Sequence, residues 1–167
     1  MKIFDSKAQA LVDFVPLNAG KVGIYVCGPT VQGAPHVGHL RSALVYDILS
    51  RWLEATGNKV TLVRNVTDID DKVLENAKSS GEQWWALAYW YEQEFNAAYR
   101  KIGIQSPTYE PRATGAIPEM LEIIDRLIAR GYAYATEDGS VYFESAKWAN
   151  YGELTNQKLD DMEAGET

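Results

Sequence analysis

Residues 22–27 read VGIYVC and residues 60–66 read VTLVRNV, two short runs rich in β-branched and aromatic side chains. Runs of this length and composition are typical of buried β-strands. Between them, apolar side chains recur every three to four residues, which predicts an amphipathic helix over residues 37–56 that ends before Gly57. A strand, a helix and a second strand within about 45 residues form a βαβ unit with parallel strands. The sequence therefore predicts an α/β fold with an open parallel sheet.

Two more helices are expected after the second strand. The first spans residues 68–79, with Thr67 or Asp68 as its N-cap. The second spans residues 81–102 and carries a stripe of aromatic and aliphatic side chains. We interpret this stripe as core packing and not as a base-stacking surface, because few Lys or Arg residues flank it. Its members are Trp84, Trp85, Leu87, Ala88, Tyr91, Phe95 and Tyr99.

A loop, a helix and a hairpin are expected in the remainder of the chain. Residues 103–113 contain two prolines and are interpreted as a connecting loop. A further amphipathic helix is predicted over residues 114–130. Its inward-facing side chains are expected to be Met120, Ile123, Ile124, Leu127 and Ile128. Residues 132–135 and 140–143 alternate in polarity around a turn that contains Gly139, which is typical of a β-hairpin.

The composition is that of a globular domain. The chain has 167 residues, of which 46% are hydrophobic and 23% are charged, and this excludes a disordered or a transmembrane chain. The net charge of −7 has the wrong sign for a protein whose whole surface follows a phosphate backbone. Cys27 is the only cysteine, so no internal disulfide forms. With no signal-peptide pattern at the start of the chain, a cytoplasmic location without membrane contact is expected.

Both histidines of the chain fall in the tetrapeptide HVGH at residues 36–39, between the first strand and the first helix. With Cys27 they offer three ligands of a metal clip, but no carboxylate of evident spacing completes it. As a second alternative, they are ordinary capping or solvent-facing side chains. We favour a third: a helix N-terminus is an anion site, Gly38 permits close approach of a ligand, and two imidazoles donate hydrogen bonds to a nucleotide phosphate. The sequence contains no P-loop and no dinucleotide-binding fingerprint.

The ends of the two strands are expected to line one crevice. In an open α/β sheet, the ligand lies outside the carboxyl ends of the strands. Residues 27–30, CGPT, follow the first strand, and residues 65–68, NVTD, end the second. Both turns therefore face the start of the helix that carries the histidines.

Three stretches in order along the chain resemble class I cysteinyl-tRNA synthetases. They read YVCGPTV at residues 25–31, PHVGH at 35–39 and VRNVTDIDDK at 63–72. The likeness extends to KIFD near the start, to EPRAT at 110–114 and to YGEL at 151–154, and so covers nearly the whole chain. It implies a Rossmann-like parallel sheet, the class I synthetase nucleotide-binding fold, with a helical segment and a small hairpin.

The resemblance also assigns roles to single residues. The HVGH tetrapeptide matches the class I signature, with Val37 in place of its usual isoleucine, and this makes His36 and His39 catalytic. Cys27 matches one ligand of a zinc ion that also takes the thiolate of the substrate cysteine. Mg²⁺ is expected with the ATP. The residues expected to bind ATP and the adenylate are Gly28, Thr30, His36, Gly38, His39, Ser42, Asn65 and Thr67.

The implied activity is ATP-dependent activation of L-cysteine and its transfer to cysteine tRNA. The family's other zinc ligands and its Lys-Met-Ser-Lys-Ser loop do not occur in this chain, so it is expected to be the N-terminal part of an enzyme, to be inactive alone, and to leave most tRNA contacts to other domains. Two alternatives stay open. One is the cysteine ligase of mycothiol synthesis, and the other is a truncated, non-catalytic paralogue that acts as a binding module.

The expected domain organisation follows the same resemblance. Residues 1–80 form the first half of the Rossmann-like catalytic domain, and residues 81–131 form a helical segment. Residues 132–159 hold the hairpin and the start of a connective region. Residues 160–167 form a mobile acidic tail.

Overall fold

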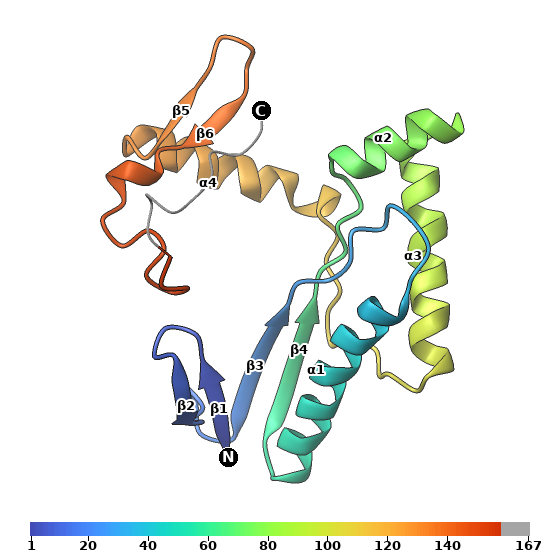
Figure 1. The fold of residues 1–167 in the computed structure, drawn as a ribbon, viewed down its shortest axis with the longest axis vertical. Coiled ribbons are helices and arrows are strands. Elements are labelled where there is room, and N and C mark those ends of the chain that lie inside the picture. The colour runs from blue at the N-terminus through green and yellow to red at the C-terminus, as the bar shows by residue number, and fades with distance from the viewer. Residues whose placement is uncertain (158–167) are drawn as a thin grey trace. The chain divides into compact units, whose positions relative to one another are not determined.

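The computed structural model describes residues 1–157 and divides the chain into two compact units (Figure 1). One unit is Pro16–Ile117, and the other combines Met1–Val15 with the chain from Pro118 onward. The boundary falls within the range 81–131 that was expected to be one helical segment. The expected acidic tail, 160–167, lies outside the described residues.

The unit Pro16–Ile117 is built on the predicted βαβ motif. Strands β3 (Lys21–Val26) and β4 (Lys59–Arg64) pair in parallel, with Val26 opposite Arg64, and helix α1 (Val37–Ala55) connects them. Figure 1 shows the two arrows side by side and pointing the same way, with α1 alongside. The predicted parallel pair and its crossover helix are confirmed.

A third segment extends this sheet where a loop was expected. Residues 108–113 run parallel to β4, with bridges from Val63 to Tyr109 and from Val66 to Arg112. The N–H of Arg64 donates to the carbonyl of Tyr109 over 3.1 Å, and the N–H of Val66 donates to that of Pro111 over 2.8 Å. Proline lacks a donor but keeps its carbonyl, so it serves at an edge position of this kind.

Helices α2 (Asp71–Ser80) and α3 (Trp84–Lys101) follow β4. The predicted N-cap of α2 was wrong, because Asp70 caps it by accepting from the N–H of Val73 over 2.9 Å. Asp68 is instead buried and accepts from the N–H and the hydroxyl of Thr114. A carboxylate that holds a neighbouring segment is not free to cap a helix.

The core of this unit lies among α1, α2, α3 and the two strand ends. Val31, Val73 and Phe95 are its most deeply buried large side chains. The aromatic stripe of α3 is only partly in the core: Leu87, Ala88, Phe95 and Tyr99 are buried, whereas Trp85 is 60% exposed. An 18-residue helix turns through all directions, so a stripe this wide cannot face one core.

Strand β3 and helix α1 are more exposed than predicted. Val22 and Val26 of β3 are buried, but Tyr25 between them is 65% exposed, so the strand is covered on one face and not on both. On α1, Ile48 and Trp52 are exposed, although they belong to the predicted apolar face.

The other unit contains two hairpins and a helix. Strands β1 (Lys2–Asp5) and β2 (Ala10–Asp13) form an antiparallel pair that was not predicted from the sequence. Strands β5 (Ala133–Ala135) and β6 (Val141–Phe143) form the predicted hairpin, with Gly139 at φ 87°. A short 3-10 turn, Ser145–Lys147, follows β6.

Helix α4 (Ile117–Ala129) begins after a 3-10 turn, Thr114–Ala116, inside the predicted range. The prediction that five apolar side chains of α4 face inward was wrong for Met120, Ile123 and Ile128, which are exposed, whereas Ile124 and Leu127 are half-buried; no residue of α4 is fully buried. The described part of its unit supplies two short hairpins, which offer little apolar surface to cover a helix. Among residues 1–157, the helices are all too short or too polar to cross a bilayer.

Candidate active site

The turns after β3 and β4 lie side by side. The N–H of Thr67 donates to the carbonyl of Pro29, and the N–H of Val31 donates to the carbonyl of Thr67, both over 3.1 Å. Thr30 and Thr67 form a parallel bridge. The sheet therefore continues for a few residues past the strands, which brings the two turns together as predicted from the sequence.

Gly28 and Asn65 make the closest approach between the two turns. The N–H of Gly28 donates to Oδ1 of Asn65 over 2.8 Å, and Nδ2 of Asn65 donates to the hydroxyl of Thr67 over 3.3 Å. A Cβ atom on Gly28 would lie 1.6 Å from the carbonyl oxygen of Asn65, which is an impossible contact. Only glycine fits at this position.

His36 and His39 cap the N-terminus of α1 with one ring nitrogen each. The N–H of Gly38 donates to Nδ1 of His36 over 3.1 Å, and the N–H of His36 donates to Nδ1 of His39 over 3.2 Å. The rings stack with their centres 3.7 Å apart. Because Nδ1 accepts in both rings, each neutral imidazole carries its proton on Nε2 and can donate from there. Capping and anion binding, considered as alternatives, are therefore compatible.

The surroundings of His39 favour its neutral form. Burial, followed by the neighbouring His36, lowers the pKa of His39 below its ordinary value of 6.5. Its ring packs edge-on against Phe95, with the centres 4.9 Å apart. A neutral imidazole with a fixed tautomer presents one donor in a defined direction.

A cavity of about 80 Å³ lies between the strand ends and α1. Four of the predicted site residues line it: Cys27, Gly28, His39 and Ser42. Asn65, Thr67 and Thr30 adjoin it through the hydrogen bonds and the bridge described above. Gly38 lines a neighbouring hollow that it shares with Ser42, and His36 is joined to the cavity through His39, by ring stacking and by the hydrogen bond from its N–H to Nδ1 of His39.

Sequence reasoning missed Arg64 and Tyr99, which also line this cavity. Arg64 is buried and bonds to Glu110, while Tyr99 lies beneath its guanidinium group. Arg64 carried a usable signal, because it is the one charged residue within the run VTLVRNV. Its partner, 46 residues away, carried none.

The described residues do not by themselves make a zinc site. The Cys27 thiol is exposed and lines the cavity. Within residues 1–157, no three side chains of His, Cys, Asp or Glu converge as a metal-binding group. A zinc ion takes four ligands, so Cys27 fits such an ion only as one member of a larger set.

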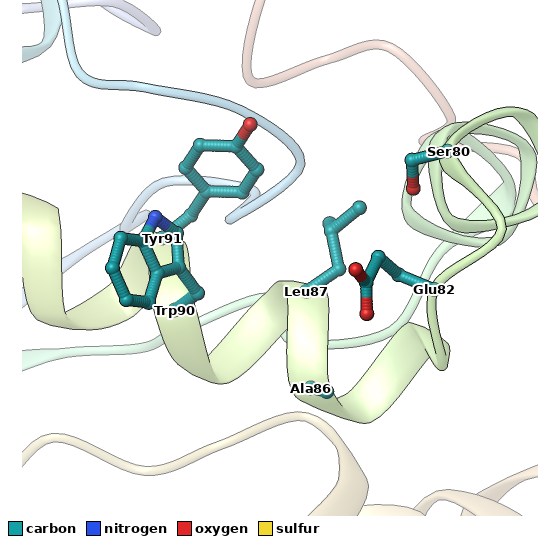
Figure 2. A pocket seen from close by; sticks show the side chains of 6 residues that line it. All are labelled: Ser80, Glu82, Ala86, Leu87, Trp90 and Tyr91. Carbon is teal, nitrogen blue, oxygen red and sulfur yellow. The ribbon is translucent and has the colours of Figure 1, made fainter.

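A second hollow, of about 380 Å³, lies where α2 meets α3 and contains none of the predicted site residues. Figure 2 shows Trp90 and Tyr91 on one side of Leu87, and Ser80 and Glu82 on the other. The indole N–H of Trp90 donates a hydrogen bond to Oε1 of Glu94. The lining of this hollow has one carboxylate, from Glu82, and no Lys, Arg or His, so it does not favour a phosphate.

Comparisons with known proteins show which family this chain resembles. Residues 13–167 match the family of tRNA synthetases class I (C) catalytic domain. The chain is 64% identical to the Cysteine--tRNA ligase of Leifsonia xyli subsp. xyli, over 98% of this chain and 36% of that protein. It is 61% identical to the Cysteine--tRNA ligase of Clavibacter michiganensis, over 98% of this chain and 35% of that protein. The chain thus spans about a third of the length of these relatives.

The fold is similar to part of a solved synthetase. The LeuRS of Agrobacterium radiobacter K84, in a ternary complex with tRNA and LeuAMS, matches 73% of this chain and 16% of its own length, with a TM-score of 0.59 at 21% identity. This likeness concerns the fold, and it confirms the predicted α/β architecture of a class I synthetase. The match over residues 13–167 and the identity to these ligases show that the chain belongs to the family of class I (C) tRNA synthetase catalytic domains.

Proposed function

We propose that this chain is the N-terminal part of a cysteine–tRNA ligase, which activates L-cysteine with ATP and transfers it to cysteine tRNA. One observation supports this most directly: the N-terminus of α1 carries two capping histidines whose Nε2 atoms remain available, beside the paired ends of β3 and β4. The relatives named as cysteine–tRNA ligases agree with it.

In the first step, an oxygen of the cysteine carboxylate attacks the α-phosphorus of ATP, and pyrophosphate leaves with the bonding electrons of the P–O bond that breaks. Negative charge grows on the phosphate oxygens in the transition state. Donors that are fixed in advance stabilise this charge without reorganising. His36 and His39 supply such donors, together with the unpaired N–H groups of the first turn of α1. No acidic residue occurs in that first turn to repel the phosphate.

The residues between the strand ends are proposed to surround the adenylate. Gly28 and Asn65 keep the two turns in contact, and Thr30, Thr67 and Ser42 offer hydroxyl groups beside them. In the second step, a hydroxyl of the terminal ribose of the tRNA attacks the cysteinyl carbonyl, and AMP leaves. Neither step needs a protein nucleophile, so catalysis rests on positioning and charge stabilisation.

The proposed ligase would use two metal ions. Mg²⁺ is expected with the ATP phosphates. Zinc would be held by Cys27 together with ligands from the rest of the ligase, and it would favour a thiolate over a hydroxyl as the substrate side chain.

We further propose a cytoplasmic enzyme whose tRNA contacts lie mainly outside this chain. The net charge of −7 supports the placement of the tRNA contacts outside this chain, because a phosphate backbone is repelled by an acidic surface except at local basic patches. We also propose that the chain is divided into a Rossmann-like first half at residues 1–80, a helical segment at 81–131 and a connective hairpin region at 132–159.

Cysteine-dependent ATP–pyrophosphate exchange tests the proposal, measured with this chain and with the full-length ligase, a protein of the relatives' length. We expect exchange and charging of cysteine tRNA by the full-length ligase, and little exchange by this chain alone. Ligation of cysteine to an amino sugar in place of charging would overturn the proposal in favour of a mycothiol-type ligase. Absence of both activities would favour a binding module.

A further inference from the structure

An ion pair between a buried arginine and a half-buried glutamate lies in the wall of the cavity that contains Cys27, Gly28 and His39. Arg64, the last residue of β4, lines this cavity, and its side chain is only 7% exposed. Its Nε and Nη2 atoms both donate to Oε1 of Glu110, over 3.0 and 2.7 Å. Its Cζ atom lies 4.3 Å from the centre of the Tyr99 ring. A planar guanidinium makes both contacts at once, whereas the ammonium group of lysine does not.

A contribution to folding stability alone does not explain why the Arg64–Glu110 pair is present. Removing the Arg64 charge and most of the Glu110 charge from water costs free energy that their attraction does little more than offset, and apolar side chains of similar volume are often equally stable in such a place. A second Arg–Glu pair with two hydrogen bonds, Arg112 with Glu92, binds the same segment 108–113 to α3 away from the cavity. The distinguishing feature of the Arg64 pair is therefore its position.

Arg64 lies where strand β4, the segment 108–113 and the turn that contains Gly28 come together. Its N–H donates to the carbonyl of Tyr109, and its side chain bonds to Glu110, so both parts of the residue hold the segment 108–113. The next residue, Asn65, holds the N–H of Gly28. A Cβ atom on Gly28 would lie 3.2 Å from Cγ of Arg64, so the stem of the side chain also borders the first turn.

Arg64 is also connected to His39 through a row of aromatic rings. The Tyr99 ring under its guanidinium lies 5.9 Å from the Phe95 ring, and the Phe95 ring lies 4.9 Å from that of His39. Phe95 and Tyr99 are both buried. Arg64 thus borders the Gly28–Asn65 contact directly, and it is linked to His39 through Tyr99 and Phe95.

We propose that Arg64, clamped by Glu110 and Tyr99, is a positioning residue for the adenylation reaction. It fixes the Gly28–Asn65 contact relative to His39 and does not itself touch the substrates. The inference rests on the proposed function. Because a displacement of about 1 Å in a reacting geometry costs up to a hundredfold in rate, loss of this clamp is expected to lower kcat and to leave binding nearly unchanged.

The test uses Arg64→Lys and Glu110→Gln in the full-length ligase, with steady-state cysteine-dependent ATP–pyrophosphate exchange. We expect kcat to fall roughly 10- to 100-fold, with KM for ATP and for cysteine unchanged within about threefold. Arg112→Lys is the matched control, since it weakens the second pair of the same segment, and it should keep kcat and KM. Unchanged kcat in both test variants, or a raised KM at constant kcat, would overturn the proposal.

A double variant separates positioning from stability. Arg64→Met combined with Glu110→Leu removes both charges and keeps apolar volume. We therefore expect the Tm of the double variant to lie closer to that of the wild type than the Tm of either single variant does, while kcat stays low. Recovery of kcat together with Tm would show that the pair is only structural. A wild-type full-length ligase without exchange would instead overturn the proposed function, and the inference with it.

Discussion

His36 does two separable things at the start of α1. Its Nδ1 atom accepts the N–H of Gly38, and its Nε2–H is proposed to donate to the α-phosphate. We expect His36→Ala to lose both roles, lowering the free energy of unfolding by about 1 kcal/mol and kcat about a hundredfold. His36→Asn keeps an N-cap but no Nε2 donor, so it should restore stability and not kcat. Chemical denaturation and pyrophosphate exchange measure the two effects, and equal kcat for Asn and wild type would remove the phosphate role.

The pH dependence of His39 follows from its burial. Burial and His36 lower the pKa of His39 in the folded state below the ordinary 6.5 of the unfolded chain. The unfolded chain therefore binds a proton first as pH falls. The contribution of this group to stability is complete above pH 6.5 and is lost as pH falls through the lower folded pKa.

Histidine Cε1 proton shifts followed by NMR measure this directly. We expect the resonance that His39→Ala removes to titrate with a midpoint below 6.5, and we expect unfolding midpoints of wild type and His39→Ala to converge as pH falls through that midpoint. A His39 midpoint at or above 6.5 would contradict the lowering of its pKa by burial and by His36.

Two glycines near the site give a matched pair of substitutions. A Cβ on Gly28 meets backbone at 1.6 Å, whereas a Cβ on Gly33 meets nothing within 4 Å. We expect Gly28→Ala to lower the free energy of unfolding by about 3 kcal/mol or more, because a backbone oxygen cannot move aside. Gly33→Ala should leave stability unchanged or raise it by less than about 1 kcal/mol. Urea denaturation of both variants measures the difference, and similar stabilities would contradict the close approach of the two turns.

At the scale of elements, helix α2 depends on Asp70. The Asp70 carboxylate accepts the N–H of Val73, and Val73 and Ala77 of this helix are buried in the core. We expect Asp70→Ala to cost about 1 kcal/mol of stability and Asp70→Asn to cost little, because asparagine is an equally good N-cap. Thermal unfolding compares the two variants. An equal loss in both would mean that the negative charge of Asp70 matters more than the cap.

Elements whose signal is local were predictable from the sequence. The strand–helix–strand unit from β3 to β4 follows from short β-branched runs and a long apolar period, and both signals lie within the elements themselves. The segment 108–113 was missed because its pairing depends on β4, more than 40 residues earlier, and because Pro107 and Pro111 indicate a loop. A proline that offers only its carbonyl to a neighbouring strand has the same sequence signal as a proline in a turn.

Burial was predicted less well than secondary structure, because it depends on what covers a face. The periodicity of α4 and the stripe of α3 both predicted inward side chains, yet Ile123 is exposed and so is Trp85. An amphipathic pattern identifies which side chains share a face. It does not identify which elements are present to pack against that face.

At the scale of the whole molecule, the site was predictable where its residues are neighbours in sequence and not where the fold brings them together. HVGH, CGPT and NVTD each stand at the end of an element, and the rule for parallel sheets places strand ends at one edge. The Arg64–Glu110–Tyr99 cluster joins a strand, a paired segment and a helix. No single stretch carries that cluster, so the sequence alone did not indicate it.

Zinc retention by this chain is limited by the number of ligands that its described residues bring together. The chain covers 36% of the Leifsonia xyli ligase, and its described residues bring no three potential ligands together. His36 and His39 each use Nδ1 for the backbone of α1, so they do not turn toward Cys27 without breaking the cap. One thiolate holds zinc weakly, because a stable site requires about four ligands.

We therefore expect this chain to lose zinc on dialysis, and the full-length ligase to retain about one ion per chain. In the full-length ligase, Cys27→Ser should reduce bound zinc and raise KM for cysteine more than KM for ATP, because a hard hydroxyl replaces a soft thiolate. Ser42→Ala, which alters the same cavity without removing a thiolate, is the matched control for metal content and should retain zinc. Metal analysis after dialysis measures the zinc content of all four proteins: this chain, the wild-type full-length ligase, and its Cys27→Ser and Ser42→Ala variants. A stoichiometric ion retained by this chain alone would mean that the histidines serve as ligands, and the assignment of their Nε2 atoms to the nucleotide would then be wrong.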